Sequence, residues 1–435
     1  MLITNHNTKS LHLSPPYLMI EVWDETWGKI GYVIIDRPVR GTTSGGVRFA
    51  SNVSVTELAS LARSMTYKWA FLNVPMGGAK AGICADPHHL GCDRGTLMEA
   101  FGRSIAPLVS QEVYHPGVDL GTTLDDLRAI MRGAGRPLSG PQIDASFCTG
   151  LTVFETIRQA TSFDGLQLAG LRVAIEGMGK VAGAVAELLA QAGAKLCAVS
   201  TVEGAIIAEN GLDVPRLLSL RQEHGDQCVR HYPGAQPIPL EALFTYPVDL
   251  LVPGARPQVI SAGNAGQVQA RLIVPISNAP MTPEAEQILV ARGIAVIPDF
   301  VANCGGVLAS NMRDNGFDVE DVRQMVKGTF AEVVVTILEN ARHEGRTVCE
   351  VARELAWQNH RQLNEPEAPL SDNMTRAVQV LRSQGLNGVH RRLAWRLYRR
   401  WPRLNGSIRR VARERYSEWG LGATLNRLEK AESIL

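Results

Sequence analysis

A glycine turn between a strand and a helix most constrains the fold of this chain. Residues 171–176 form a short apolar run typical of a buried strand, and the Ala-rich residues 181–193 have a helix pattern. The turn fits G-x-G-x-x-A; its residues are Gly177, Met178, Gly179, Lys180, Val181 and Ala182. Glycine lets the backbone approach a pyrophosphate, and the helix start offers free N–H groups. The pattern favours dinucleotide binding over a purely structural turn.

The same alternation of helix and strand continues along the chain. A helix pattern at 151–162 precedes the turn, a strand at 195–200 follows it, and three short apolar runs come later. Those runs lie at 248–252, 271–276 and 293–297, each followed by a Pro, Asn or Gly turn. Such alternation predicts a parallel, doubly wound sheet of the Rossmann type.

The first part of the chain has a different pattern. Residues 18–36 predict two strands around a turn, and residues 55–72 predict a helix capped by Ser54 or Thr56. A Pro/Gly-rich segment follows at 74–80, and another helix pattern spans 93–109. Residues 134–150 contain Gly, Pro and Ser and are typical of a connection between domains.

The length, 435 residues, suggests two or three domains. We expect an α/β protein whose first domain comprises residues 1–140 plus returning helices at 319–370. A Rossmann domain is expected at 150–315, and residues 371–435 form an extension.

No apolar run is long enough for a transmembrane helix, and the first residues carry no secretory signal. Seven scattered cysteines without a CxxC pair argue against disulfides or structural zinc, so we expect no metal and a cytoplasmic location.

The second strand of the dinucleotide unit departs from the usual pattern. An acidic residue normally ends that strand and holds the ribose hydroxyls. Here Thr201 stands at the strand end, and Glu203 follows two positions later. No arginine stands there to take a 2′-phosphate. NAD and NADP both remain open, with a slight preference for NAD because Glu203 would repel an additional phosphate.

Lysine is rare in this chain. Only eight of the 44 basic residues are lysine, yet Lys68 and Lys80 lie 12 positions apart. A lysine among glycines and apolar residues can be desolvated, which lowers its pKa and makes a usable general base. Lys68, at the end of the predicted helix, could bind a carboxylate. From composition alone, the favoured interpretation is that Lys68 and Lys80 are ordinary surface lysines.

Several sequence motifs, which follow one another along the chain, change this preference for surface lysines. Residues 45–87 contain Gly-Gly-Val-Arg-Phe, Met-Thr-Tyr-Lys and Pro-Met-Gly-Gly-Ala-Lys. Residues 115–123 contain Asp-Leu-Gly-Thr, residues 274–285 contain Asn-Ala-Pro-Met-Thr, and residues 298–307 are Pro-Asp-Phe-Val-Ala-Asn-Cys-Gly-Gly-Val. From about 18 to 365 the chain resembles the glutamate/leucine/phenylalanine/valine dehydrogenase family, most closely its glutamate-type members. The resemblance implies an N-terminal substrate and oligomerisation domain, a Rossmann domain binding NAD or NADP, and a homo-oligomer.

The resemblance also implies roles for individual residues. Lys80 matches the catalytic lysine and Asp119 the catalytic aspartate, while Lys68 matches the lysine that holds the substrate α-carboxylate. The implied reaction is oxidative deamination of an L-amino acid to a 2-oxo acid and ammonia. The remaining implied positions are Gly45 and Gly46 at the pocket wall, Asn303 near nicotinamide and substrate, and Thr149 and Asn278 near the nicotinamide carboxamide and ribose.

The substrate pocket is mixed. Glutamate-type members carry a lysine before the Gly-Gly pair and a serine after the last motif, and both bind the side-chain carboxylate. This chain has Ser310 near Val307 but Ser44 in place of the lysine. Burying a carboxylate without its cation is costly. Glutamate is favoured, an apolar amino acid is the alternative, and a catalytically weak regulatory or binding paralogue is the third.

The net charge of +1 hides two unlike parts. Residues 371–435 carry 14 basic and 5 acidic residues, whereas residues 1–370 carry 30 and 38. The basic extension mixes arginine with Trp395, Tyr398 and Trp401. The favoured interpretation is a helical extension that packs on the acidic body or on a neighbouring subunit. Contact with nucleic acid or with an anionic membrane is the less favoured alternative.

Overall fold

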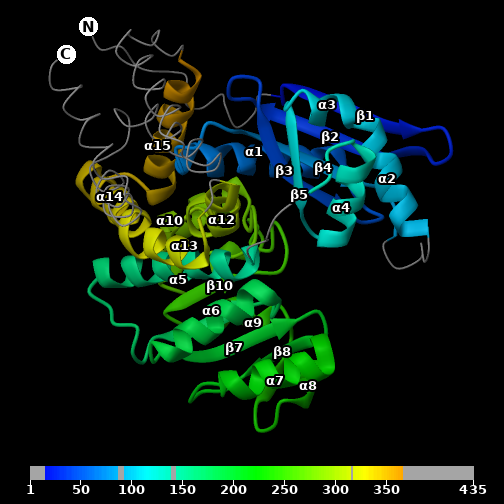
Figure 1. Cartoon of the computed structure of the whole chain (residues 1–435). Coiled ribbons are helices and arrows are strands. Elements are labelled where there is room, and N and C mark those ends of the chain that lie inside the picture. The colour runs from blue at the N-terminus through cyan, green and yellow to red at the C-terminus, as the bar shows by residue number, and fades with distance from the viewer. Residues whose placement is uncertain (1–14, 87–92, 139–143, 315–316, 366–435) are drawn as a thin grey trace, which may run out of the picture.

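The computed structural model describes residues 15–86, 93–138, 144–314 and 317–365, which form two α/β domains on separate sheets (Figure 1). The expected two-domain α/β architecture is therefore confirmed. No helix in these ranges is long and apolar enough to cross a membrane.

The first sheet has five strands in the order β1-β2-β4-β3-β5. The predicted hairpin is present as β1 (Leu18–Asp24) and β2 (Gly28–Arg37), which pair antiparallel. The chain then returns through β3 (Thr43–Phe49), β4 (Gly77–Ile83) and β5 (Tyr114–Val118). β4 is antiparallel to β2, whereas β3 is parallel to both β4 and β5, so the sheet is mixed.

Helices cover both faces of this sheet. Ile34 of β2 packs against Leu58 and Ala62 of α1 (Val55–Phe71) on one face. Its neighbours Val33 and Ile35 belong to the cluster that contains α2 and α4, because successive side chains of a strand point to opposite faces. α1 begins where predicted, with Ser54 accepting a hydrogen bond from the backbone N–H of Glu57. The other helices of this domain are α2 (Arg94–Ser104), α3 (Ala106–Ser110) and α4 (Leu124–Gly133).

The central strand β4 was not predicted, because glycine is depleted in strands. The Pro/Gly-rich segment ends in this strand, and each of its residues is buried. A Cβ on Gly78 would lie 2.2 Å from the backbone N of Thr66 and 2.3 Å from the carbonyl O of Ala62. The glycine therefore allows α1 to lie directly on the sheet.

Two other sequence expectations are wrong in detail. The helix pattern at 93–109 is divided at Ile105 into α2 and α3, with Pro107 in the first turn of α3. Proline disrupts a helix interior but fits a first turn. The connection expected at 134–150 ends early, since α5 (Ala145–Phe163) begins after its cap Asp144; residues 139–143 lie outside the described ranges.

The second sheet has seven strands in the order β12-β11-β10-β6-β7-β8-β9. The first five run parallel, which confirms the predicted doubly wound sheet. β8 and β9 add antiparallel pairing at one edge, which was not predicted. The strands are β6 (Arg172–Glu176), β7 (Lys195–Thr201), β8 (Gly204–Ile207), β9 (Gln236–Ile238), β10 (Leu250–Pro253), β11 (Leu272–Ile273) and β12 (Ala295–Val296).

Helices pack around this sheet, with α5 against α6 and α12. They are α6 (Lys180–Gln191), α7 (Val214–His224), α8 (Cys228–His231), α9 (Ala242–Thr245), α10 (Pro283–Ala291), α11 (Asp299–Ala302) and α12 (Gly305–Asp314).

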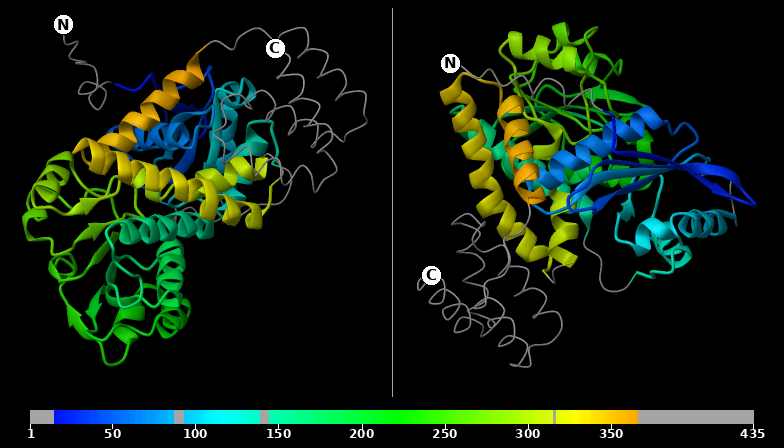
Figure 2. Two further views of the ribbon diagram at one scale, coloured as in Figure 1. Left: turned by 90° about the vertical axis from the view of Figure 1, so that its left-hand side faces the viewer. Right: turned by 90° about the horizontal axis from the view of Figure 1, so that it is seen from above.

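The last helices connect the two domains (Figure 2). They are α13 (Val319–Met325), α14 (Ala331–Glu344) and α15 (Val348–Asn364). α14 packs on α5 of the second domain, whereas α15 packs on α1 of the first. Assignment of 319–370 to the first domain stays a prediction, and the extension 371–435 lies outside the described residues.

Candidate active site

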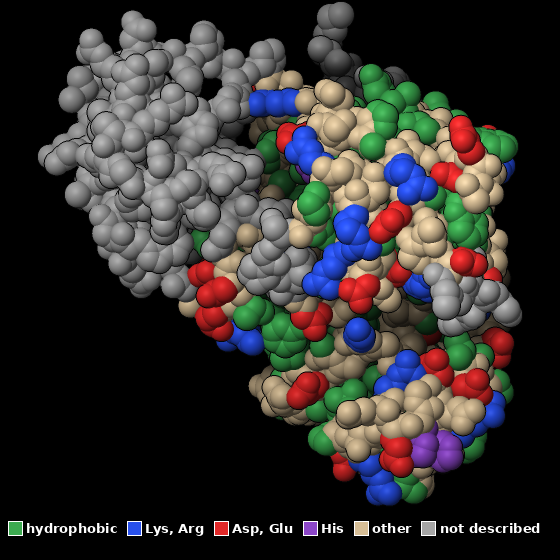
Figure 3. Space-filling view, turned by 45° about the vertical axis from the view of Figure 1, so that its right-hand side comes forward, with side chains coloured by type: hydrophobic (Ala, Val, Ile, Leu, Met, Phe, Trp, Pro, Cys, Tyr) green, Lys and Arg blue, Asp and Glu red, His purple; other side chains and the backbone are tan. Residues whose placement is uncertain are grey.

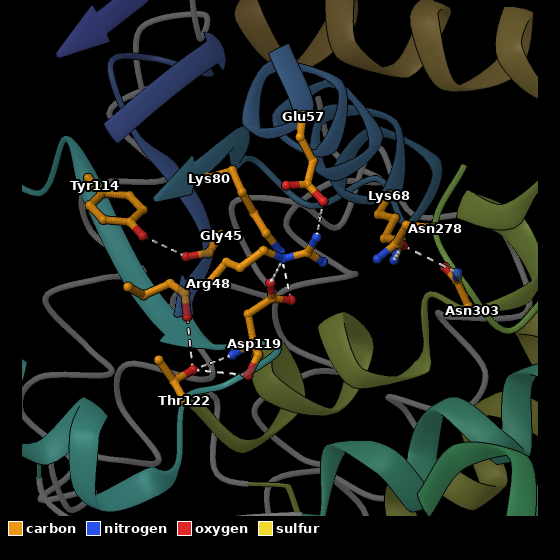
Figure 4. A network of polar contacts seen from close by, with 11 residues as sticks. Gly45, Arg48, Glu57, Lys68, Lys80, Tyr114, Asp119, Thr122, Asn278 and Asn303 are labelled. Carbon is orange, nitrogen blue, oxygen red and sulfur yellow. Dashed lines mark hydrogen bonds and ion pairs between the residues drawn. The ribbon is translucent and has the colours of Figure 1, made fainter. Parts of the chain in front are cut away.

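Lys80 and Asp119 lie in direct contact. Lys80 is on β4, where it pairs with Ile34, and therefore faces α1. Asp119 follows β5, and its backbone N–H donates to Oγ1 of Thr122 at 2.8 Å. Nζ of Lys80 lies 2.8 Å from Oδ1 of Asp119, and the two side chains are only 4% and 16% exposed (Figure 4). The structure thus brings the two predicted catalytic residues together.

A second cation holds the same carboxylate. Nε of Arg48 donates to Oδ2 of Asp119 at 3.0 Å. Burial works against ionisation of Asp119, but Lys80 and Arg48 outweigh it and hold the pKa of the carboxyl below its ordinary value. Asp119 is therefore an anion with a cation on each oxygen.

Lys68 reaches from the first domain to the second. It lies in the last turn of α1 and is 5% exposed. Its Nζ donates to Oδ1 of Asn278, on the loop after β11, at 2.7 Å. Burial lowers the pKa of Lys68 to about 8, although the negative charge of Asp299 opposes the shift. This ammonium is poised to bind an anion between the domains.

Asn303 adds an amide beside this contact. The residue follows α11 and is 4% exposed. Its Nδ2 donates to the carbonyl oxygens of Ile276 and Ser277 at 2.9 and 3.1 Å. Its Oδ1 is buried without a hydrogen-bond partner among the described residues. A buried acceptor of this kind is available to a ligand.

The glycine pair on β3 makes room for the acidic loop. A Cβ on Gly46 would lie 2.7 Å from the carbonyl O of Val118 and 2.8 Å from Cβ of Asp119. The carbonyl O of Gly45 accepts a hydrogen bond from the buried hydroxyl of Tyr114 at 2.9 Å. Ser44 precedes the pair, is partly buried, and its carbonyl O accepts a hydrogen bond from Nε1 of Trp69 at 3.3 Å.

Val307 and Ser310 lie on α12 of the second domain. Both are partly buried on α12, and no hydrogen bond in the described part of the chain links either to Lys80 or Asp119. Oγ of Ser310 accepts a hydrogen bond from Nη2 of Arg313 at 3.3 Å. The arginine was not predicted. The structure therefore places a cation beside the serine expected to bind a side-chain carboxylate.

Thr149 fixes the start of α12 against α5. Its Oγ1 donates to the carbonyl O of Ala145 at 2.7 Å and accepts from the backbone N–H of Gly306 at 3.0 Å. Thr149 is only partly buried. It thus links α5 to the motif at residues 298–307.

The glycine turn of the second domain fits a dinucleotide pyrophosphate. Gly177 has φ +85, and Gly179 caps α6 without a side-chain hydrogen bond and with open space where a Cβ would stand. Free N–H groups therefore face outward beside the exposed Lys180. Met178 and Ala182 are 2% and 3% exposed. Their side chains, together with the partly buried Val181, pack on the core.

Glu176 supports this turn and was not predicted. It ends β6 and is 5% exposed. Its Oε2 accepts from the backbone N–H groups of Gly254 and Ala255 at 3.2 and 3.1 Å. Burial raises the pKa of this carboxyl. The residue joins the ends of β6 and β10, the two strands between which the order of the sheet reverses.

The strand end at Thr201 does not offer an acid to a ribose. Thr201 is 5% exposed, and its Oγ1 donates to the carbonyl O of Asp226 at 2.6 Å. Oε2 of Glu203 lies 2.8 Å from Nη2 of Arg230, an arginine that was not predicted. Glu203, just after β7, is therefore paired with a basic residue of α8.

Arg48 was overlooked although the sequence carried a signal for it. It follows Ser44 by four positions within a strand, so alternation places both on the face that carries Lys80. No strand was predicted there, and the periodicity was not applied. Arg313 reaches Ser310 because the two residues lie one helical turn apart on α12. Arg230 reaches Glu203 through tertiary packing.

Figure 3 shows a recess between the two parts of the molecule, with Lys and Arg side chains at its edge. The described residues contain no group of three or more His, Cys, Asp or Glu side chains suited to a metal ion.

Two family models match the chain. The dimerisation-domain model of the Glu/Leu/Phe/Val dehydrogenases matches residues 24–135, and the Glutamate/Leucine/Phenylalanine/Valine dehydrogenase model matches residues 143–365. The glutamate dehydrogenase of Thermotoga maritima is 33% identical over 330 residues, which cover 70% of this chain and 79% of that protein.

Solved structures show the same fold. The hetero-hexameric glutamate dehydrogenase of Thermus thermophilus, in its leucine-bound form, is 27% identical with a TM-score of 0.70, covering 80% of this chain and 89% of that one. The L-tryptophan dehydrogenase of Nostoc punctiforme is 24% identical with a TM-score of 0.60, covering 82% and 99%. The second likeness concerns the fold alone.

Proposed function

Because this chain belongs to the glutamate/leucine/phenylalanine/valine dehydrogenase family and is an amino-acid dehydrogenase, we propose that it catalyses reversible NAD(P)-dependent oxidative deamination of L-glutamate to 2-oxoglutarate and ammonia. The observation that carries the proposal is the contact between Lys80 and Asp119. Lys68 lies on the same side of the first sheet, on the helix that covers Lys80.

Each member of the cluster has a role in this proposal. Lys68 binds the substrate α-carboxylate as a point charge. A bound NAD or NADP would supply the acceptor for the hydride that leaves the substrate Cα, and loss of this hydride turns the substrate into an iminium. In its neutral form, Lys80 takes a proton from the water that attacks the iminium carbon, and Asp119 moves protons to and from the departing nitrogen. Closure of the domains excludes bulk water.

The turn at residues 177–182 is proposed to hold the pyrophosphate, and Thr149, Asn278 and Asn303 are proposed to lie near the nicotinamide. Asn303 supports this placement because its buried Oδ1 has no partner among the described residues. Thr201 and Glu203 are proposed to face the adenosine ribose. We favour NAD slightly because Glu203 would repel a 2′-phosphate.

Glutamate is favoured because Ser310 has Arg313 beside it at 3.3 Å, which places a cation near the proposed side-chain carboxylate. An apolar amino acid is the second candidate. Ser44 offers no cation, and the relatives include a leucine-bound glutamate dehydrogenase and a tryptophan dehydrogenase. The third candidate is a catalytically weak regulatory or binding subunit, because Ser44 and Thr201 depart from the family pattern and the chain carries a basic extension.

A substrate panel tests the proposal. The purified full-length chain is incubated with NAD or NADP and each L-amino acid at alkaline pH, and reduced cofactor is followed by absorbance. Glutamate is expected to give the highest kcat/KM. Higher values for leucine, valine, phenylalanine or tryptophan would establish the second candidate. No reduction with any amino acid would contradict an active dehydrogenase and favour the regulatory subunit.

We also propose a homo-oligomer formed through the outer edge of the first sheet. β1 is an edge strand, and its exposed side chains include Leu18, Met19 and Trp23. An exposed apolar edge is a site for pairing with another chain.

The basic extension is proposed to pack on its own subunit or on a neighbouring one. The protein is proposed to be located in the cytoplasm.

A further inference from the structure

We propose that Arg48 is a positioning residue that fixes the Asp119 carboxylate against Lys80, and that Glu57 sets how strongly Arg48 acts. This inference rests on the proposed role of Asp119 as the proton carrier of an amino-acid dehydrogenase.

The geometry assigns a different cation to each carboxylate oxygen. Nζ of Lys80 lies 2.8 Å from Oδ1, and Nε of Arg48 lies 3.0 Å from Oδ2. The arginine side chain is only 11% exposed. Water therefore screens these contacts weakly, and charge-assisted hydrogen bonds of this kind are strong and directional. The carboxylate is held in one orientation between β3 and β4.

The other end of Arg48 is also engaged. Nη1 donates to the carboxylate of Glu57, in the first turn of α1, and Glu57 is 30% exposed. Lys80, Asp119, Arg48 and Glu57 thus form a chain of alternating charge across β4, the loop after β5, β3 and α1 (Figure 4). Because Glu57 competes for the guanidinium, it weakens the attraction of Arg48 for Asp119.

Other titratable groups near Asp119 act less directly. Lys68 on α1 and the phenol of Tyr114 on β5 interact with it electrostatically. Arg94 on α2 donates to the carbonyl O of Gly121 and pairs with Asp126 instead. Among the described residues, Lys80 and Arg48 are the side chains that hydrogen-bond the Asp119 carboxylate.

Neutralising Arg48 and neutralising Glu57 should shift the pKa of Asp119 in opposite directions. Loss of the Arg48 charge removes a cation from Asp119, so its carboxyl should gain a proton more easily. Loss of the Glu57 charge leaves Arg48 more attractive to Asp119, so the carboxyl should gain a proton less easily. If Arg48 and Glu57 had a purely structural role, the two substitutions would not shift the pKa of Asp119 in opposite directions.

The test uses Arg48→Gln, Arg48→Lys and Glu57→Gln in the full chain. Profiles of kcat against pH are expected to show the acid limb about one pH unit higher for Arg48→Gln and lower for Glu57→Gln. Arg48→Lys should restore most of the wild-type profile. We expect kcat to fall more than KM changes, since Arg48 orients a proton carrier.

Arg63→Gln is the matched control. Arg63 also joins α1 to the sheet through a short contact, 2.7 Å from Nε to Oδ2 of Asp36, and is 16% exposed. It should lower thermal stability without moving the acid limb. Thermal unfolding and dinucleotide binding, measured for each variant, show whether Arg48→Gln remains folded. Glu57→Gln changes a partly exposed residue and keeps the test open if Arg48→Gln does not fold.

A readout without turnover separates this inference from the proposed function. Carbon-13 NMR titration of the Asp119 carboxyl should show the same opposite shifts in the two variants. Equal or absent shifts in an active enzyme overturn the role of Arg48 and Glu57 alone. A wild-type chain inactive with every amino acid overturns the proposed function, while the NMR titration still decides the charge chain.

Discussion

Nζ of Lys68 donates a 2.7 Å hydrogen bond to Oδ1 of Asn278, joining α1 of the first domain to the loop after β11 of the second. A carboxylate is a stronger acceptor for an ammonium than an amide oxygen. We therefore expect a substrate α-carboxylate to compete with Asn278 for Lys68. Substrate binding would in this way act on a contact that links the domains.

Lys68→Met should stabilise the fold at pH 7. The pKa of Lys68 is lowered by burial to about 8, below its value of 10.5 in the unfolded chain. Between these values the unfolded chain binds a proton that the folded chain lacks, so stability rises with pH through this window. Below pH 8 both states are protonated, and the full cost, roughly 3 kcal/mol, is present. Urea unfolding at several pH values measures it.

The control for this prediction is Lys195→Met, which changes an exposed lysine on β7. It should leave the slope of stability against pH unchanged. A Lys68→Met variant that is less stable at pH 7, or that keeps the rise above pH 8, would show that burial of this ammonium is not costly.

Asp119→Asn should abolish most turnover while the dinucleotide still binds. An amide keeps the size of the carboxyl but cannot carry the proton, and general acid–base groups contribute about 10²–10⁴-fold. The measurements are kcat with the preferred amino acid and dinucleotide affinity by fluorescence. Retention of more than a tenth of wild-type kcat would remove Asp119 from the proposed mechanism.

The fold was predictable where local pattern and tertiary packing agree. The hairpin at 18–36 alternates, and the glycine turn at 177–182 sits between a strand and a helix. β4 was missed because Gly78 and Gly82 lower strand propensity, yet these glycines let α1 approach. That requirement comes from the helix packed above the strand and leaves no periodic signal within it.

The site was predictable only in part. Residues alone favoured surface lysines at 68 and 80, and the family resemblance singled them out with Asp119. The structure then added Arg48, which contacts Asp119 across 71 positions of sequence. Such pairings are set by the register of β3 beside β5, which composition and local spacing do not encode.

Ser44→Lys should shift preference toward glutamate. Ser44 is partly buried on β3 and shares the face that carries Lys80, so a lysine there would supply a cation for a side-chain carboxylate. We expect at least a tenfold rise in the ratio of kcat/KM for glutamate to that for leucine. Ser310→Ala should lower this ratio. Unchanged turnover of both substrates in Ser44→Lys would refute the pocket assignment.

Glu203→Gln should improve use of NADP relative to NAD. Its carboxylate pairs with Arg230 at 2.8 Å, so the change removes a repelling charge and releases an arginine for a 2′-phosphate. The expected gain in the kcat/KM ratio is about fivefold, or ~1 kcal/mol. Adding Arg230→Gln should cancel it. An unchanged ratio would place the 2′ position away from Glu203.

Trp23→Lys should break the proposed oligomer. Trp23 lies on the edge strand β1 and is 59% exposed, and lysine on an edge strand opposes pairing with a second copy. Light scattering after size exclusion should show a smaller particle for this variant. Val202→Lys changes a side chain that is 76% exposed on the second domain, and it should leave the mass unchanged. If Trp23→Lys keeps the wild-type mass, the interface lies on another surface and the apolar edge of β1 needs a different partner.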